Sequence, residues 1–135
     1  MSAAKEVKQD RKYMKDHEWA LEQGAELLVG ITAFAVDQLG DITLVNLDVK
    51  AGDSVEAHKP FGTIESVKTL SDLYAPVSGK IVRVNAELES RPELVNEDPW
   101  DKAWMIAIAP AKLADEASGL LDPNAYLAHL EASAH

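Results

Sequence analysis

A single lysine, Lys68, stands between two halves of a segment that both have the pattern of β-strands. The segment is GTIESVKTLSDLYAPVSG, residues 62–79, and its middle has none of the Asn-Gly or Asp-Gly pairs that tight hairpins prefer. A lysine at the tip of a rigid hairpin is exposed on all sides. An enzyme can therefore close over it, and its long aliphatic stem can serve as a tether. The position favours a covalent carrier arm, whereas the alternative is the ordinary solvated surface lysine.

No other set of side chains has the pattern of an independent active site. The chain has no cysteine, which excludes disulfide scaffolds, zinc-thiolate sites and cysteine nucleophiles. Its four histidines are scattered, the serines near Lys68 lack a nucleophile elbow, and the glycines lack the spacing of phosphate-binding loops. A paired-carboxylate mechanism stays open among the 23 acidic residues. We therefore expect a protein that is not an enzyme, holds no metal, and takes any redox chemistry from a cofactor.

Length and charge limit the class of protein. A chain of 135 residues with 47% hydrophobic and 27% charged residues is typical of one soluble globular domain. The net charge of −10 disfavours a nucleic-acid partner, and no stretch reaches the roughly 20 apolar residues of a membrane span. The first residues are charged and of mixed sign, unlike a secretory signal or a transit peptide. We expect a flexible N-terminal extension at 1–12, one domain at 13–135, and a cytoplasmic location (the mitochondrial matrix if the source is eukaryotic).

Short strands separated by turns surround the lysine. Hydrophobic alternation and turn residues predict strands at 19–22, 25–30, 41–49, 61–64, 70–77, 80–85 and 104–109. Thr32 is a predicted cap for a helix at 33–39 that Gly40 ends. One or two helical turns are expected between 85 and 96, and Asp122-Pro123 should begin a C-terminal helix that runs to 132. Many short strands with frequent turns predict a small β-sandwich or barrel.

The chain resembles the glycine cleavage H-protein family over residues 13–131. The motifs that carry the resemblance are HEW at 17–19, VGIT at 29–32, LGDI at 39–42, FG at 61–62, ESVK at 65–68, SDLYAPVSG at 71–79 and PELVNEDP at 92–99. Several motifs in this order make a specific match, whereas FG alone would mean little. Gly52 and Gly79 also flank Lys68, as turn glycines do in lipoyl and biotinyl carriers.

The resemblance implies a fold and a cofactor. The fold is mainly β, a barrel-sandwich hybrid of two small antiparallel sheets with short flanking helices and a C-terminal helix. The cofactor is lipoic acid, joined by an amide bond to Lys68. Biotinyl carriers usually place methionine on both sides of the lysine, whereas this chain has Val67 and Thr69, so lipoate is favoured.

The resemblance also implies a function and partners. The lipoyl-lysine arm would carry the aminomethyl group of glycine from glycine decarboxylase, a pyridoxal-phosphate enzyme, to an aminomethyltransferase that uses tetrahydrofolate. Dihydrolipoyl dehydrogenase would then reoxidise the arm with FAD and NAD, and lipoate-attaching enzymes are further expected partners. Two alternatives stay open: a lipoyl scaffold or relay protein for other lipoate-dependent pathways, and an unmodified β-rich interaction domain.

Four other residues are candidates for the site. A cleft that shelters the loaded arm should be apolar along its length and acidic where the ammonium group lies, and we expect Glu18 and Asp72 at that end, with His17 nearby. The alternative is that both carboxylates are solvated and that His17 only packs. Glu65 is a candidate contact for the lipoate-attaching enzyme, or an acceptor that stabilises the turn.

Three positions depart from the family pattern. Ala33-Phe34 stand where the family often has an acidic residue followed by Tyr or His, and Thr69-Leu70 replace a small pair. Ala103 stands before a tryptophan where a glycine is common. We expect the first two changes to alter contacts near the arm and the third to alter a turn, without affecting attachment at Lys68.

Overall fold

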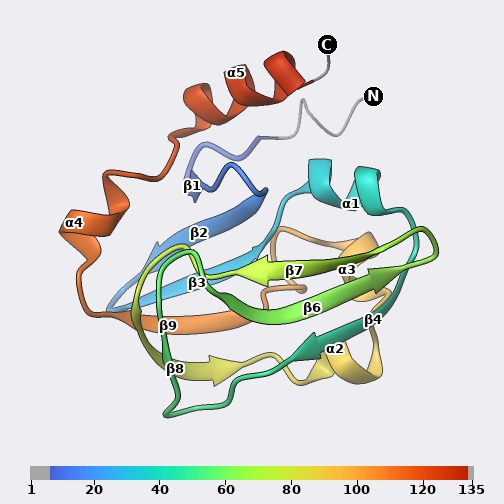
Figure 1. The fold of residues 1–135 in the computed structure, drawn as a ribbon, viewed down its shortest axis with the longest axis horizontal. Helices are drawn as coiled ribbons and strands as arrows, with labels where there is room; N and C mark the ends of the chain where they lie inside the picture. Colours follow the sequence, from blue (N-terminus) through green and yellow to red (C-terminus); the bar gives the residue numbers. More distant parts are fainter. Residues whose placement is uncertain (1–6, 134–135) are drawn as a thin grey trace.

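The computed structural model describes residues 7–133, which fold into two antiparallel sheets with helices at their margins (Figure 1). The larger sheet has the strand order β1-β2-β3-β9-β8-β5, and the smaller has the order β4-β6-β7. The strands are β1 (Lys12–Tyr13), β2 (Glu18–Gln23), β3 (Glu26–Ile31), β4 (Ile42–Leu47), β5 (Ser54–Val55), β6 (Pro60–Ser66), β7 (Leu70–Tyr74), β8 (Gly79–Val84) and β9 (Ile106–Pro110). The helices are α1 (Ala33–Leu39), α2 (Glu87–Ser90), α3 (Leu94–Glu97), α4 (Leu113–Ala117) and α5 (Pro123–Ser133).

The predicted mainly β fold is confirmed. The two sheets stack as a sandwich and, over the described residues, do not close into a barrel. Both sheets contribute side chains with almost no exposed surface to one core, among them Val29, Phe61, Ile64, Leu73 and Ile108. Burying alternate side chains of each strand supplies the main stabilising term, because apolar area leaves water on both inner faces.

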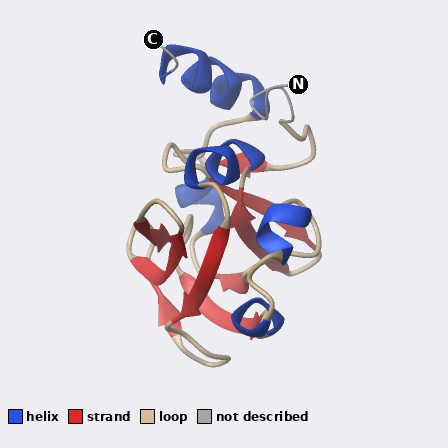
Figure 2. Cartoon of the chain, turned by 90° about the vertical axis from the view of Figure 1, so that its right-hand side faces the viewer, coloured by secondary structure: helices blue, strands red, loops and turns tan. Residues whose placement is uncertain are grey.

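A smaller core joins the two ends of the described chain. Tyr13 of β1 stacks on Tyr126 of α5 with ring centroids 4.4 Å apart, and Trp100 packs edge-on against Tyr13. Leu130 of α5 is buried in the same cluster. Figure 2 shows α5 beyond the strands at one end of the molecule, so these contacts are what hold it there.

The helix caps form as the sequence predicts. Thr32 Oγ1 accepts a hydrogen bond from the Ala35 amide, and the Gly40 amide donates to Val36 at the other end of α1. Asp122 Oδ1 accepts from the Ala125 amide at the start of α5, at 2.7 Å. Each cap satisfies an amide or carbonyl that a helix end leaves without a partner.

Some elements differ from the prediction. The helix α4 was not predicted, because Leu113–Ala117 is a single short turn with no side-chain cap and no apolar period. The last strand is Ile106–Pro110 instead of 104–109, and β4 is shorter than 41–49 at both ends. Element ends are the least specified part of such a pattern, because fraying residues add little burial.

The predicted boundary after residue 12 falls inside β1. Lys12 pairs with Ala20 of β2, and Arg11 is buried. Residues 11 and 12 therefore pack with the domain, whereas residues 1–6 of the predicted extension lie outside the described residues. Among residues 7–133, no helix is long and apolar enough to cross a membrane.

Candidate functional site

Lys68 lies in the tight turn between β6 and β7, and the Ser66 side chain shapes that turn. The Ser66 amide donates to the Thr69 carbonyl at 2.8 Å. Ser66 Oγ in return accepts from the amides of Lys68 and Thr69, at 3.1 and 3.2 Å. A serine hydroxyl that binds amides two and three residues ahead stabilises a turn without requiring a positive φ. Among the described residues other than glycine, only His17 and His58 have a positive φ. Val67 and Lys68 therefore do not adopt the backbone conformation for which tight hairpins use Asn-Gly.

The Lys68 side chain is exposed, as the sequence predicts. Its ammonium group makes no hydrogen bond or ion pair with any part of the chain that the structure describes. The Lys68 side chain lies close to Gly40, since a Cβ atom added to Gly40 would be 3.5 Å from Lys68 Cε. The lysine stem therefore passes over the end of α1. The lysine is therefore accessible, and its stem is directed toward the helix that lines the cleft described below.

The lysine turn is fixed to β4 and, through Asn96, to α3. The Val67 amide donates to the Asp41 carbonyl at 3.0 Å. Asn96 bridges the same segment: its Nδ2 donates to the Gly40 carbonyl and its Oδ1 accepts from the Ile42 amide, both at 2.9 Å. These bonds give the base of the lysine side chain a defined position. Sequence reasoning missed Asn96, although it lies inside the motif PELVNEDP.

A cleft of about 150 Å³ lies between the start of β2, helix α1 and the hairpin β6–β7. It brings together His17, Glu18 and Asp72, the three residues predicted for it. Its other lining residues, which the sequence did not single out, are Asp16, Ile31, Ala35, Gln38, Leu39, Ile64, Ser71 and Leu73. The lining is thus acidic and apolar, and Gln38 and Leu39 directly precede Gly40, over which the lysine stem passes.

Glu18 is a buried carboxyl group in this cleft, with 2% of its surface exposed. Its Oε2 accepts a hydrogen bond from the Tyr74 amide at 2.9 Å, whereas Oε1 is buried and has no hydrogen-bond partner. Burial disfavours the charged form and raises the pKa of Glu18 to about 8, against the smaller opposing effect of the Tyr74 bond. A buried acceptor without a partner is costly, so Oε1 is ready to receive a donor.

His17 occupies a strained backbone conformation beside Glu18, with φ of 79°. Its Nδ1 lies 2.9 Å from the Tyr126 hydroxyl, which also lies 2.7 Å from Thr32 Oγ1. Burial, with a smaller contribution from nearby His129, lowers the pKa of His17. The His17 ring packs on Phe34, one of the two residues that depart from the family pattern at that site, at 4.8 Å. The predicted alteration of the cleft lining by Phe34 stays a prediction.

Asp72 and Glu65 differ from Glu18 in burial. Asp72 is exposed at the edge of the cleft, and its Oδ2 lies 3.5 Å from the Tyr74 hydroxyl. Glu65 lies outside the cleft on the exposed face of the small sheet, paired across strands with Leu70. The structure therefore places Asp72 with the cleft and Glu65 with the hairpin surface near Lys68.

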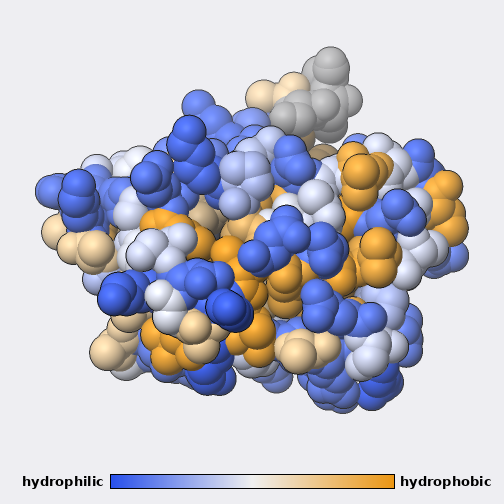
Figure 3. All heavy atoms as spheres, turned by 60° about the horizontal axis from the view of Figure 1, so that its bottom comes forward, coloured by the Kyte–Doolittle hydropathy of each residue, from blue (hydrophilic) through white to orange (hydrophobic). Residues whose placement is uncertain are grey.

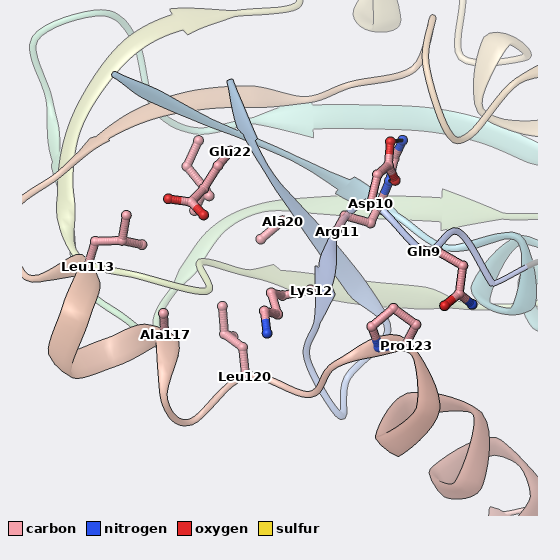
Figure 4. Close-up of a pocket in the computed structure, with 11 residues that line it drawn as sticks. Gln9, Asp10, Arg11, Lys12, Ala20, Glu22, Leu113, Ala117, Leu120 and Pro123 are labelled. Atoms are coloured by element: carbon pink, nitrogen blue, oxygen red, sulfur yellow. Dashed lines mark hydrogen bonds and ion pairs between the residues drawn. The ribbon is translucent and has the colours of Figure 1, made fainter. Parts of the chain in front are cut away.

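A larger cleft of about 230 Å³ lies elsewhere, between β1, β2 and α4 (Figure 4). Asp10, Arg11, Lys12 and Glu22 contribute the charged groups of its lining, and Leu113 and Leu120 contribute apolar surface. It contains none of the predicted site residues and shares no residue with the cleft next to Lys68. Among the described residues, no group of three acidic, histidine or cysteine side chains could hold a metal ion.

Comparisons with known proteins agree on one family. The family model for the glycine cleavage H-protein matches residues 11–133. The glycine cleavage system H protein of Halalkalibacterium halodurans is 51% identical over 115 residues, 85% of this chain and 88% of that protein. The H protein of Bacillus licheniformis is 47% identical over 126 residues, 93% of this chain and 94% of that protein.

A solved structure has the same fold. The crystal structure of a glycine cleavage system H protein from Mycobacterium marinum is 36% identical and superposes with a TM-score of 0.83, covering 93% of this chain and 99% of that one. The fold and the hairpin together define a carrier domain that presents one lysine beside a cleft. The chain belongs to the glycine cleavage H-protein family.

Proposed function

We propose that this protein is the lipoyl carrier of a glycine cleavage system and that lipoate is joined to Lys68. Family membership supports the carrier role. The observation that carries the assignment to Lys68 is its position: an exposed lysine without a partner among the described residues, on a turn held by Ser66, with its stem over the end of α1, the helix that lines the cleft containing Glu18. In this role the attached cofactor supplies the groups that make and break bonds, so we propose that the protein is a carrier subunit and not an enzyme.

The residues present fit such an arm. When attached, lipoate supplies a disulfide that can accept the glycine-derived cargo and a dithiol that can be reoxidised. Lys68 anchors the arm, and the apolar side chains Leu39, Ile64 and Leu73 line the cleft against water. The unpartnered Glu18 Oε1 is the acceptor for a cationic amine, and Asp72 adds a second carboxylate at the cleft edge. A donor at Oε1 would stabilise the ionised form of Glu18, which burial alone disfavours.

The proposed partners follow from the same role. They are glycine decarboxylase with pyridoxal phosphate, aminomethyltransferase with tetrahydrofolate, dihydrolipoyl dehydrogenase with FAD and NAD, and the enzymes that attach lipoate. The relatives described above are bacterial, which supports a cytoplasmic location.

Intact mass spectrometry after co-expression with a lipoylating system tests the attachment. We expect one lipoyl adduct on the wild-type chain and none on Lys68→Arg, with Lys59→Arg as the matched control. A wild-type chain without an adduct would favour the unmodified interaction domain. Glycine-dependent reduction of the modified protein by glycine decarboxylase then separates the glycine carrier from a lipoyl relay protein.

The acidic end of the cleft gives a second prediction. Replacing both Glu18 and Asp72 by alanine should shorten the lifetime of the bound aminomethyl cargo by on the order of tenfold, because the cationic amine loses both carboxylates. The measurement is the rate of ammonia release from the loaded protein in the absence of the transferase. The control replaces Glu22 and Asp37, two exposed carboxylates outside this cleft. An unchanged lifetime in the cleft variant would contradict the proposed role.

A further inference from the structure

The larger cleft, between β1, β2 and α4, has no part in the proposed function. We call it the α4 cleft, and its lining includes Lys12, Ala20, Glu22, Leu113 and Leu120. Hydrophobic groups reach the surface at several separate places on the face of the molecule that Figure 3 shows, so exposed apolar surface alone does not single out a binding site. The α4 cleft differs because its volume of about 230 Å³ combines apolar walls with a few charged side chains, as small-molecule sites do.

Two of the four charged side chains in the α4 cleft already neutralise each other. Arg11 Nε lies 2.8 Å from Asp10 Oδ1, and Arg11 Nη1 donates to the Trp100 carbonyl at 2.9 Å. Lys12 and Glu22 differ from this pair, because neither side chain forms an ion pair or a hydrogen bond with the part of the chain that the structure describes. One cation and one anion of the lining are therefore left to contact a ligand.

The register of the large sheet holds these two charges apart on one face. Lys12 pairs directly with Ala20, which stands two residues before Glu22 in β2. All three side chains therefore point to the same face, and Lys12 and Glu22 are diagonal neighbours with Cβ atoms roughly 7–8 Å apart. In Figure 4 the Lys12 side chain extends toward Leu120, whereas the Glu22 carboxyl group extends toward Leu113. The cation and the anion thus lie on either side of buried Ala20.

The walls of the α4 cleft are fixed at both ends. Tyr13 of β1 exchanges two backbone hydrogen bonds with Leu121, at 2.8 and 2.7 Å, which ties the strand next to Lys12 to the segment that follows α4. Glu116 of α4 accepts hydrogen bonds from the Ser78 amide and the Ser78 hydroxyl, both at 2.7 Å. The cleft therefore has its shape before a ligand arrives, which lowers the entropic cost of binding.

We propose that the α4 cleft binds a free aliphatic α-amino acid. A ligand that matches a separated cation and anion carries both charges itself, with its carboxylate at the Lys12 ammonium group and its own ammonium group at the Glu22 carboxylate. A side chain such as that of leucine covers Leu113 and Leu120, whereas glycine leaves them in contact with water. The volume of the cleft corresponds to roughly eight water molecules, which is room for one such amino acid.

An NMR titration of the full-length unmodified protein with leucine tests this site. We expect saturable shifts of the amide signals of Ala20, Leu27 and Ala117, which line the cleft, with a Kd on the order of 1 mM because water screens both charged contacts. Isoamylamine and isocaproate keep the apolar part of leucine but only one charge each. Each should bind about tenfold more weakly, since one charged contact is lost.

Two variants locate the binding site within the chain. Lys12→Met and Glu22→Gln keep most of the side-chain length but remove one charge, and each should weaken leucine binding about tenfold. Added salt should weaken binding to the wild type more than binding to either variant. The matched controls are Lys59→Met and Glu56→Gln, two exposed residues outside this cleft, and both should bind leucine as the wild type does. Thermal unfolding checks that all four variants keep the fold.

Each of the other outcomes would overturn the proposal. Titration with leucine without saturable shifts would show that the cleft binds no amino acid of this kind. Equal binding of leucine, isoamylamine and isocaproate would show that the two charges do not select the ligand. Leucine binding that neither Lys12→Met nor Glu22→Gln weakens would place the ligand outside the α4 cleft. The α4 cleft shares no residue with the cleft next to Lys68, so these results and the test of lipoate attachment are independent of each other.

Discussion

The Ser66 side chain stabilises the lysine turn, which lacks the Asn-Gly pair that most tight hairpins use. Its hydroxyl holds the amides of Lys68 and Thr69, and only 7% of the residue is exposed. Ser66→Ala leaves two turn amides without this acceptor, so we expect a loss of roughly 1 kcal/mol in the free energy of unfolding and slower lipoylation of Lys68. Chemical denaturation and intact mass measure the two effects.

Two controls accompany this prediction: one keeps a hydroxyl at residue 66, and the other removes a hydroxyl elsewhere in the chain. Ser66→Thr retains the hydroxyl and should recover most of the stability. Ser54→Ala removes an exposed serine of β5 and should change neither quantity. Equal losses from the alanine variants at residues 54 and 66 would show that the Ser66 hydroxyl has no special role in the turn.

Glu18 should make stability depend on pH. Its carboxyl has a pKa of about 8 in the folded protein and 4.5 in a model peptide. Between these values the folded state keeps a proton that the unfolded state has lost. The free energy of unfolding therefore falls as pH rises, by about 1 kcal/mol from pH 7 to 9. Glu18→Gln should abolish this decrease, which denaturation at several pH values would detect.

Neighbouring groups have distinguishable effects on that pH profile. The Asp16 charge also favours the protonated form of Glu18, and Asp72 lines the same cleft. His17 has a lowered pKa, so its contribution to stability changes at and below about pH 6.5, outside the measured range. A wild-type profile that is flat between pH 7 and 9 would contradict the burial of a titrating Glu18.

At the scale of single residues, the sequence predicted which residues lie at the site better than it predicted how buried they are. The motif ESVK and the lone lysine predicted Lys68 at a hairpin tip, and HEW predicted Glu18 near Asp72. The burial of Glu18 could not be predicted, because it depends on contacts with segments far away in the sequence, such as that of the Tyr74 amide, 56 residues away. Solvated and buried carboxylates look the same in a sequence until such contacts are known.

At the scale of elements, the Tyr126 hydroxyl connects α5 to the cleft. It reaches both His17 Nδ1 and Thr32 Oγ1, and the side chain is fully buried. Tyr126→Phe keeps the stacking on Tyr13 but leaves the half-buried His17 imidazole and the buried Thr32 hydroxyl each short of one partner. We expect a loss of roughly 1–3 kcal/mol in stability and a shift of the His17 ring signals in NMR.

Tyr74→Phe is the matched control for this prediction. The Tyr74 hydroxyl makes one long contact, 3.5 Å to exposed Asp72, so its removal should cost much less. Faster amide exchange in α5 of the Tyr126→Phe variant would add support. Unchanged His17 signals would show that the link between α5 and the cleft is not formed in solution.

Elements with a strong local signal were predicted best. Thr32 and Gly40 mark both ends of α1, and Gln23-Gly24 marks the turn between β2 and β3. The strand β1 has only two residues, and what defines it is pairing with β2 and bonds to Leu121. A strand of two residues has no hydrophobic periodicity that a sequence could reveal, so only the tertiary fold determines it.

At the scale of the whole molecule, Arg11 anchors the start of the described chain to two tryptophans, Trp19 of β2 and the distant Trp100. Its guanidinium lies 4.6 Å from the Trp19 ring centre and 5.4 Å from that of Trp100, and its Nη1 donates to the Trp100 carbonyl at 2.9 Å. Arg11→Ala should lower the free energy of unfolding by roughly 1–3 kcal/mol, because a buried cation–π contact and a charged hydrogen bond are lost.

A second arginine on a tryptophan provides the comparison. Arg83 lies 5.0 Å from the Trp104 ring centre and pairs with Glu26, but 48% of its side chain is exposed. Solvent screens this contact, so Arg83→Ala should cost well under 1 kcal/mol in thermal or chemical denaturation. Equal costs for the two variants would contradict the anchoring role of Arg11.

The small sheet has two outer strands, and neighbouring side chains cover amides on both. Glu18 accepts from the Tyr74 amide of β7, while Asn96 and Glu89 accept from the Ile42 and Leu47 amides of β4. A strand whose outward amides are already bonded is a poor template for a strand from another molecule. The protein can thus display hydrophobic side chains beside Lys68, the proposed attachment site, and still resist edge-to-edge aggregation, as a carrier that must leave each partner requires.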